Sequence, residues 1–395
     1  MRRLLLLMTV LSLTACTTFD TVKDSVSGIS DYFSGGEDNA DPPAILTEFI
    51  PEVKVEKLWD ASIGVGANEQ TVKLVPVVHN QNIITADREG FVQSRHLTTG
   101  DKVWSVETAL RLSGGAGLGA GTVVFGSSNA EVIALNSDSG EKLWQVKVSG
   151  EVLSIPTIAK HIVIVRTTDG TVSALNEQTG AKLWSYEHNV PPLSIRGTGT
   201  PLIVGDKVIT GYDNGKLIAL DLNNGKFAWE TSIAIPKGRS EVERLVDLDV
   251  DPIETNDVIY IASYRGGIAA ISASDGDIMW RNESISSYSG LSHDFRYLYL
   301  SDSHGHVWQI DQRTGGGLWQ QKDLHHRRLT APVTYQNYVV VGDFEGYVHW
   351  LSSTDGRLLG RTQVADSAIE AKPIVVDDVI YIYAKDGTLA ALKIK

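Results

Sequence analysis

The chain has 395 residues, and its 35 lysines and arginines stand against 48 aspartates and glutamates, giving a formal net charge of −13. This acidic balance argues against a nucleic-acid backbone as a partner, because phosphate binding depends on a basic surface. A single cysteine excludes an intramolecular disulfide, and the length is ample for a large hydrophobic core.

Residues 1–15 have the features of an export signal. Arg2 and Arg3 supply positive charge, and residues 4–13 form an apolar stretch that is too short to span a bilayer as a stable helix. The sequence Leu-Thr-Ala-Cys at 13–16 resembles a bacterial lipobox, so we predict a lipoprotein signal peptide that is removed and a lipidated Cys16. The alternative is an ordinary signal peptide followed by a chance cysteine. Thr17, rather than Asp, follows Cys16, which favours anchoring in the outer membrane through several acyl chains.

Residues 16–50 are expected to form the lipidated cysteine and a flexible tether. After Cys16 this segment contains seven acidic residues against Lys23 alone, together with a Gly-Gly and a Pro-Pro step. Such a composition buries too little apolar surface to fold alone. A flexible coil of this length would have its ends roughly 30–35 Å apart. The short apolar pieces at 26–29 and 32–33 leave docking on another surface open.

From residue 51 to 395 the chain repeats one pattern, seen most clearly at 168–184 as TDGTVSALNEQTGAKLW. Asp-Gly is a tight turn that needs positive φ, and the alternating residues after it predict a half-buried strand. Thr-Gly marks a second turn, and Lys-Leu-Trp begins another strand with a large ring to bury. The chain contains eight copies of the glycine turn.

Two sets of residues mark the period of the repeat. Proline begins apolar runs where a first strand needs no ladder donor, at Pro76, Pro156, Pro201, Pro252, Pro332 and Pro373. Tryptophans recur at intervals of 39 to 51 residues, at Trp59, Trp104, Trp144, Trp184, Trp229, Trp280 and Trp319. A period near 40 with strand and turn content predicts a β-propeller with one four-stranded blade per repeat.

The number of blades follows from the two ends of the repeat region. The last glycine-turn copy, at 386–392, has no tryptophan strand after it, whereas the first tryptophan strand, at 55–59, has no glycine turn before it. Joining the two completes one blade and removes exposed sheet edges. We therefore predict an all-β, eight-bladed propeller of four-stranded antiparallel blades, closed by N- and C-terminal strands that share a blade.

Two neighbouring repeats carry inserts, at 186–200 and 235–252. Lengthened loops on a rigid scaffold often hold binding residues. The first insert places Leu193 and Ile195 beside Arg196, which combines apolar contact with a guanidinium. The second alternates, so that Asp247, Asp249 and Asp251 point to one face and can orient Arg196 or meet a basic partner. The alternative is drift in repeat length with a solvated acidic strand face.

Other conspicuous residues have ordinary structural explanations. The glycine run at 114–121 lacks the βαβ context of a nucleotide fingerprint, and we expect it to let an inner strand pack closely. The pairs His304/His306 and His325/His326 are apart from other ligands in sequence, so we expect turn or surface positions and no metal. The basic step at 327–328 is either a solvated loop or a partner contact.

The repeat Ala-Leu-Asn/Asp-x-x-Thr-Gly-x-x-x-Trp resembles that of pyrroloquinoline-quinone (PQQ) enzyme propellers. Together with the lipobox, the tether and the loops at 193–197 and 244–249, the chain resembles the BamB family, lipoproteins of the outer-membrane β-barrel assembly (BAM) machinery. In that family the matching loops bind BamA, the barrel-inserting subunit, through a POTRA domain. The resemblance implies that Leu193, Ile195 and Arg196 contact BamA, with Asp247 and Asp249 supporting them. Ile195 stands where leucine is common, which keeps the apolar contact.

The resemblance also implies a function and its alternatives. It implies a non-catalytic scaffold without cofactor, lipid-anchored in the outer membrane and facing the periplasm, which joins BamA and the other subunits in inserting outer-membrane proteins. Unfolded client strands are a further possible partner, through the blade edges. One alternative is a PQQ- and Ca²⁺-dependent quinoprotein dehydrogenase, which often has an adjacent cysteine pair and long insertions. The other is a periplasmic propeller that binds a different ligand in its channel.

Overall fold

The structure, a computed structural model, describes residues 42–68, 70–189, 199–235 and 245–395. Within these ranges every regular element is a β-strand, and residues 42–395 form one compact unit. None of the described segments forms a helix with the length and apolar character that crossing a bilayer requires.

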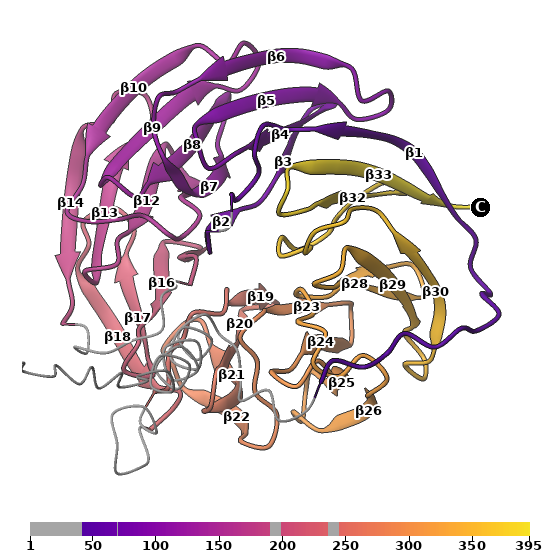
Figure 1. The fold of residues 1–395 in the computed structure, drawn as a ribbon. Coiled ribbons are helices and arrows are strands. Elements are labelled where there is room, and N and C mark those ends of the chain that lie inside the picture. Colours follow the sequence, from indigo (N-terminus) through magenta and orange to yellow (C-terminus); the bar gives the residue numbers. More distant parts are fainter. Residues whose placement is uncertain (1–41, 69, 190–198, 236–244) are drawn as a thin grey trace, which may run out of the picture. The chain divides into compact units, whose positions relative to one another are not determined.

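Eight sheets are arranged in a ring, each running from a short strand near the centre to a longer strand at the rim (Figure 1). Blade 1 consists of β3 (Val77–His79), β4 (Asn82–Ala86), β5 (Phe91–His96) and β6 (Lys102–Glu107). Blade 2 consists of β7 (Leu112–Leu118), β8 (Thr122–Ser127), β9 (Glu131–Asn136) and β10 (Lys142–Lys147). Blade 3 consists of β11 (Thr157–Ala159), β12 (Ile162–Arg166), β13 (Thr171–Asn176) and β14 (Lys182–Glu187). Blade 4 consists of β15 (Leu202–Val204), β16 (Lys207–Gly211), β17 (Lys216–Asp221) and β18 (Phe227–Ser232).

The other half of the ring repeats this order. Blade 5 consists of β19 (Ile253–Thr255), β20 (Val258–Ser263), β21 (Gly267–Ser272) and β22 (Ile278–Asn282). Blade 6 consists of β23 (Leu291–His293), β24 (Tyr297–Ser301), β25 (Val307–Asp311) and β26 (Gly317–Gln321). Blade 7 consists of β27 (Val333–Tyr335), β28 (Tyr338–Gly342), β29 (Tyr347–Ser352) and β30 (Leu358–Gln363). Blade 8 consists of β31 (Ile374–Val376), β32 (Val379–Tyr383), β33 (Thr388–Ile394) and β1 (Val55–Ser62).

Blade 8 closes the ring by joining the two ends of the repeat region. Strand β1 pairs antiparallel with β33, from Val55 opposite Ile394 to Ser62 opposite Thr388. This confirms the predicted eight blades and the shared closing blade. One strand was not predicted: β2 (Lys73–Leu74) adds to blade 2 in parallel with β7, near the centre of the ring.

The marker prolines and glycine turns lie where the pattern predicts. Each of the six prolines directly precedes the first strand of its blade. The glycine of the turn between the second and third strands has positive φ, for example +86° at Gly170 and +78° at Gly215. An L-residue with a side chain rarely adopts this conformation, which explains the recurring Asp-Gly and Asn-Gly steps.

Each marker tryptophan packs onto the next blade, against the glycine of its second turn. A Cβ added to Gly180 would lie 2.7 Å from Cε3 of Trp144, so only glycine leaves room for the ring. Trp144 Nε1 also donates to the carbonyl of Glu177, in the same turn of blade 3, at 2.7 Å. The same pair of contacts joins Trp104 to Gly140 and Ser137, and Trp184 to Gly225 and Leu222.

The eighth interface lacks a tryptophan because the N-terminal segment fills its place. Gly360, on β30, stands where the repeat predicts the ring, and a Cβ added there would lie 3.1 Å from the carbonyl oxygen of Val53. Val53 also donates its backbone NH to the carbonyl of Leu359 at 3.0 Å and is 7% exposed. The segment before β1 therefore seals the joint between blades 7 and 8.

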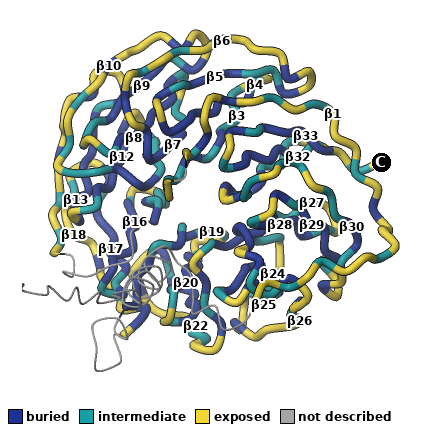
Figure 2. Tube along the Cα trace, viewed as in Figure 1, coloured by how far each residue is buried: buried dark blue, intermediate teal, exposed yellow. Residues whose placement is uncertain are grey.

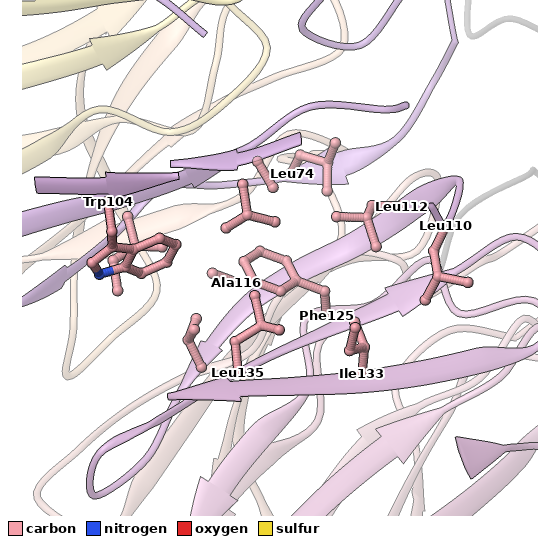
Figure 3. Close-up of a cluster of buried hydrophobic side chains, with 12 residues drawn as sticks. Leu74, Trp104, Leu110, Leu112, Ala116, Phe125, Ile133 and Leu135 are labelled. Atoms are coloured by element: carbon pink, nitrogen blue, oxygen red, sulfur yellow. The ribbon is translucent and has the colours of Figure 1, made fainter. Parts of the chain in front are cut away.

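Apolar side chains fill the spaces between blades. In one such cluster, Leu74, Leu112 and Phe125 pack with Trp104 of the preceding blade (Figure 3). Rim strands alternate exposed and buried residues, whereas the second and third strands of a blade are largely buried (Figure 2). The glycine run lies in and beside β7, and a Cβ on Gly117 would lie 1.9 Å from the carbonyl of Pro156, which confirms its role in close packing.

Candidate partner-binding surface

The structure describes two of the six predicted site residues. Cys16, Leu193, Ile195 and Arg196 lie outside the described residues, and Asp247 and Asp249 lie within them. The described residues on either side of 190–198 and 236–244 belong to blades 3, 4 and 5.

The described residues that lead into the two inserts lie at the same end of the ring. In an antiparallel blade, the turn between the second and third strands lies at the same end as the connection to the next blade. His188 donates its backbone NH to the carbonyl of Gly170 at 3.3 Å, and Ile233 donates to Gly215 at 2.8 Å. The chain therefore enters each gap beside a glycine turn, and that end of blades 3 to 5 is the candidate surface.

Residues 245–252 run along the joint between blades 4 and 5 without forming a strand. Leu248 is fully buried, and a Cβ added to Gly211 would lie 2.7 Å from its Cβ. Ser263 Oγ donates to the carbonyl of Val246 at 3.3 Å. Asp247 is only 1% exposed, so the alternative of a solvated acidic strand face is wrong for this residue.

Asp247 and Asp249 belong to a group of carboxylates that also includes Asp213, in the β16–β17 turn. Burial, reinforced by the charges of Asp213 and Asp247, raises the pKa of the Asp249 carboxyl well above its usual value. The charges of Arg166 and Lys73 oppose this shift without cancelling it. Asp249 Oδ1 is enclosed and has no hydrogen-bond partner among the described residues. Among the described residues, Asp249 is therefore a buried carboxyl that other carboxylates surround and that lacks a donor to Oδ1.

Arg166, at the end of β12, supplies the nearest cation from the ring. Its side chain is 1% exposed, and Nη2 lies 3.3 Å from Oδ1 of Asp213, which is 5% exposed. The guanidinium carbon lies 4.9 Å from the centre of the Tyr212 ring. A buried, delocalised cation between a carboxylate and an aromatic ring is a favourable use of arginine.

Asp251 ties the end of the first insert to the centre of the ring. Its Oδ1 accepts the backbone NH of Thr200 at 2.6 Å and Nζ of Lys73, on β2, at 2.5 Å. Burial opposes ionisation of Asp251, but Lys73 and Thr200 outweigh it and lower its pKa. Asp251 is therefore a charged anchor for the chain leaving 190–198.

Comparison with known proteins shows to which family the chain belongs. The family model described as "Outer membrane protein assembly factor BamB" matches residues 88–321 and 309–395. The chain is 46% identical over 354 residues to the Pseudomonas aeruginosa outer membrane protein assembly factor BamB, covering 90% of this chain and 93% of that protein. The chain belongs to the BamB family.

Solved structures agree with this placement in the BamB family. The crystal structure of BamB from Moraxella catarrhalis has a TM-score of 0.78 at 28% identity, covering 86% of this chain and all of that one. The quinohemoprotein alcohol dehydrogenase of Comamonas testosteroni has a TM-score of 0.65 at 13% identity, covering 86% of this chain and 76% of that one. The second likeness concerns the fold alone.

The described side chains that precede residues 190–198 in this BamB-family protein contact those of the β16–β17 turn. The rings of His188 and Tyr212 contact each other at a tilt of 47°, with centres 4.3 Å apart, and His188 Nε2 lies 3.0 Å from Nδ2 of Asn214. Burial, with the charges of Lys216 and Arg166, lowers the pKa of His188 despite the opposing Glu230. The lowered pKa favours the neutral form of His188, beside the positive charges of Lys216 and Arg166.

Two residues of this surface, and one contact of a third, were missed from sequence. Arg166 follows the apolar run Ile-Val-Ile-Val, and a charge at a core position of a strand is the signal that could have revealed it. Asp213 looked like an ordinary turn residue. Asp251 shares the alternation of Asp247 and Asp249, but no sequence feature pairs it with Lys73, 178 positions away.

The same end of the ring also gathers histidines. The pairs His304/His306 and His325/His326 occupy a turn and a connection, as expected, but the structure brings together the two pairs, which are separate in sequence. The backbone NH of His326 donates to the carbonyl of His304 at 2.6 Å, and Asp302, His304 and His306 are close enough together to hold a metal ion. These residues are distant from the Arg166 group in sequence and belong to blade 6 and the connection to blade 7.

Proposed function

We propose that this protein is a non-catalytic scaffold that binds BamA, through a POTRA domain, and helps to fold and insert outer-membrane proteins. The observation that carries the proposal is the 46% identity to an outer membrane protein assembly factor over nine-tenths of the chain. The likeness to a dehydrogenase is limited to the fold, so we propose no enzymatic activity and no PQQ or other cofactor.

The proposed contact with BamA is made by Leu193, Ile195 and Arg196, supported by Asp247 and Asp249. Asp249 is buried beside Asp213 and Asp247, and its Oδ1 has no hydrogen-bond partner among the described residues, which supports a role in holding a further cation. Arg196 belongs to the adjacent insert and would supply that cation. Asp251 and Lys73 would hold the root of that insert at Thr200.

The remaining parts of the proposal concern location and other partners. We propose that residues 1–15 are removed, that Cys16 is lipidated in the outer membrane, and that the propeller faces the periplasm. Residues 16–41, ahead of the compact unit that begins at residue 42, would then tether the ring, allowing it to reach BamA, the other BAM subunits and unfolded client strands. Replacing Cys16 with Ser should move the protein from the membrane to the soluble fraction, and an unchanged membrane fraction would contradict lipidation.

The contact with BamA can be tested by pull-down from detergent-solubilised membranes with wild type, Arg196→Glu and a control. Loss of a central interfacial arginine typically costs about 2–4 kcal/mol, or roughly 30- to 1,000-fold in affinity. Arg111→Glu is the matched control, because Arg111 is an exposed arginine in the connection between blades 1 and 2.

We expect wild type and Arg111→Glu to bring down BamA, and Arg196→Glu to fail while its circular dichroism stays that of a folded ring. Recovery of BamA with all three proteins would leave the scaffold function standing and refute the site. Failure of all three would refute binding to BamA itself.

A further inference from the structure

Four of the ten histidines in the chain gather between blade 6 and the connection to blade 7. His304 and His306 belong to the β24–β25 turn, and His325 and His326 to the connection between β26 and β27. The ring of His304 stacks on that of His306, with centres 5.8 Å apart and planes at 15°. The ring of His326 lies 6.2 Å from that of His304, centre to centre.

A carboxylate completes this cluster. One oxygen of Asp302 and one ring nitrogen each of His304 and His306 lie within 4.8 Å of one another. Ligands of a zinc ion, at about 2.0–2.2 Å from the metal, are separated by roughly 3–4 Å. Rotation of the exposed His304 side chain is therefore enough to bring the three atoms into coordinating positions.

Asp302 and His306 already have the spacing of two neighbouring ligands. Nδ1 of His306 lies 3.0 Å from Oδ2 of Asp302, so the two share a proton that a metal ion can replace. Nε2 of Gln320 lies 3.0 Å from Nδ1 of His306. Rotation about the terminal bond of Gln320 would bring its amide oxygen to the same position beside His306.

Other groups hold Asp302 in place, as supporting groups do around metal ligands. Trp308 Nε1 donates to Oδ2 at 2.8 Å, and the backbone NH groups of His304 and His306 each donate to Oδ1 at 2.9 Å. Asp302 is 9% exposed, whereas His304 faces solvent. The carboxylate is therefore fixed, and the site remains open to an ion from solution.

The positive charge of Arg327, near the histidine cluster, does not prevent a cation from binding there. Arg327 is 3% exposed at its side chain and directs its guanidinium to Asp343, at 2.8 Å, and to Glu345, at 2.5 Å. Its charge is thus balanced by two carboxylates. The same arginine donates to the carbonyl of Ala44 at 2.9 Å, so the cluster adjoins the segment that precedes β1.

We propose that Asp302, His304 and His306 form a binding site for a divalent transition-metal ion of the zinc class. Two imidazoles and one carboxylate suit Zn²⁺, Ni²⁺ or Cu²⁺, whereas Mg²⁺ and Ca²⁺ prefer sites made of oxygen alone. The ion would link the β24–β25 turn to its carboxylate, with His326 beside it in the neighbouring connection. The proposal is independent of BamA binding.

The test is calorimetric titration of the full-length lipidated protein in detergent with ZnCl₂, in the presence of excess Mg²⁺. Wild type is compared with His304→Ala, His306→Ala and the control His79→Ala. The control removes a histidine whose Nε2 lies 3.0 Å from Oδ1 of Asp138, a pair that belongs to no group of three ligands among the described residues. Circular dichroism confirms that each variant is folded.

We expect wild type and His79→Ala to bind one Zn²⁺ with similar affinity, and His304→Ala and His306→Ala each to lose about tenfold or more. Zn²⁺ should also raise the Tm of wild type and not that of His304→Ala. Absence of saturable binding at one ion per chain would overturn the proposal. Equal affinity of wild type and either of the two cluster variants would overturn it as well.

Discussion

Arg166 offers the sharpest test of the charge balance at the candidate surface. Replacing it with methionine keeps most of the side-chain volume and removes the charge. Asp213, 5% exposed and 3.3 Å from the guanidinium, then loses its cation, as does the neighbouring Asp249. Removing one partner of a buried ion pair typically costs about 3–5 kcal/mol, and we expect Arg166→Met to lower the free energy of unfolding by that amount at neutral pH.

The pH dependence of this loss follows from Asp249. Its pKa in the folded protein is already raised, so its contribution to stability falls as the pH rises from its ordinary value through the raised one. Arg166 holds that pKa down, and Arg166→Met raises it further. The difference between variant and wild type should therefore be small in acid, where the carboxyl is protonated, and grow as the pH increases.

Urea unfolding followed by tryptophan fluorescence measures both effects, at about pH 5 and at about pH 8. Arg111→Met, at an exposed position, is the control and should change stability little. The double variant Arg166→Met/Asp213→Asn should recover part of the loss, because it removes the unpaired carboxylate. A loss below about 1 kcal/mol, or an equal loss at both pH values, would refute the reasoning.

Three further predictions concern stability. Trp144→Phe removes the 2.7 Å bond to the carbonyl of Glu177 and should cost about 1–3 kcal/mol, measured as a lower unfolding midpoint; no change would refute the role of this bond. Gly180→Ala meets the Trp144 ring at 2.7 Å and should destabilise more than Gly205→Ala, which has positive φ but open space; equal effects would mean that backbone strain alone matters. Asp249→Asn should stabilise the free protein increasingly as the pH rises, since its carboxyl pKa is raised; a stability advantage confined to acid pH would contradict this.

The ring could be predicted from sequence because its determinants are local and recur. Each Asp-Gly or Thr-Gly turn needs a positive φ that glycine alone adopts easily, and each tryptophan needs a glycine on the next blade. Repetition of these constraints around the ring fixes the period, and the incomplete copies at its two ends fix the closure by β1. The missing tryptophan at Gly360 could be noted but not explained, because the residue that replaces its contact, Val53, lies more than 300 positions away.

The charged contacts could be predicted only in part, since they depend on which blades become neighbours. Sequence reasoning found Asp247 and Asp249 through their alternation, and missed Arg166 and Lys73, which reach them from blade 3 and from β2. Similarly, His304 and His326 lie in separate repeats, and nothing in either repeat shows that the β24–β25 turn touches the following connection. The ring brings together residues whose local sequences carry no sign of one another.

The stability of the closed ring explains how it can hold a group of buried carboxylates at one end. A closed propeller distributes its stability over eight similar interfaces, each with buried apolar side chains and most with a tryptophan on a glycine. It can therefore tolerate one place where Asp249 is buried beside Asp213 and Asp247 and has no hydrogen-bond partner for Oδ1 among the described residues. Adding a cation there, from Arg196 or from a partner, lowers the energy of a group whose positions are already fixed. Because the rigid ring already fixes these carboxylates, binding a cation costs little further conformational entropy. Groups that destabilise the free ring are therefore well suited to binding.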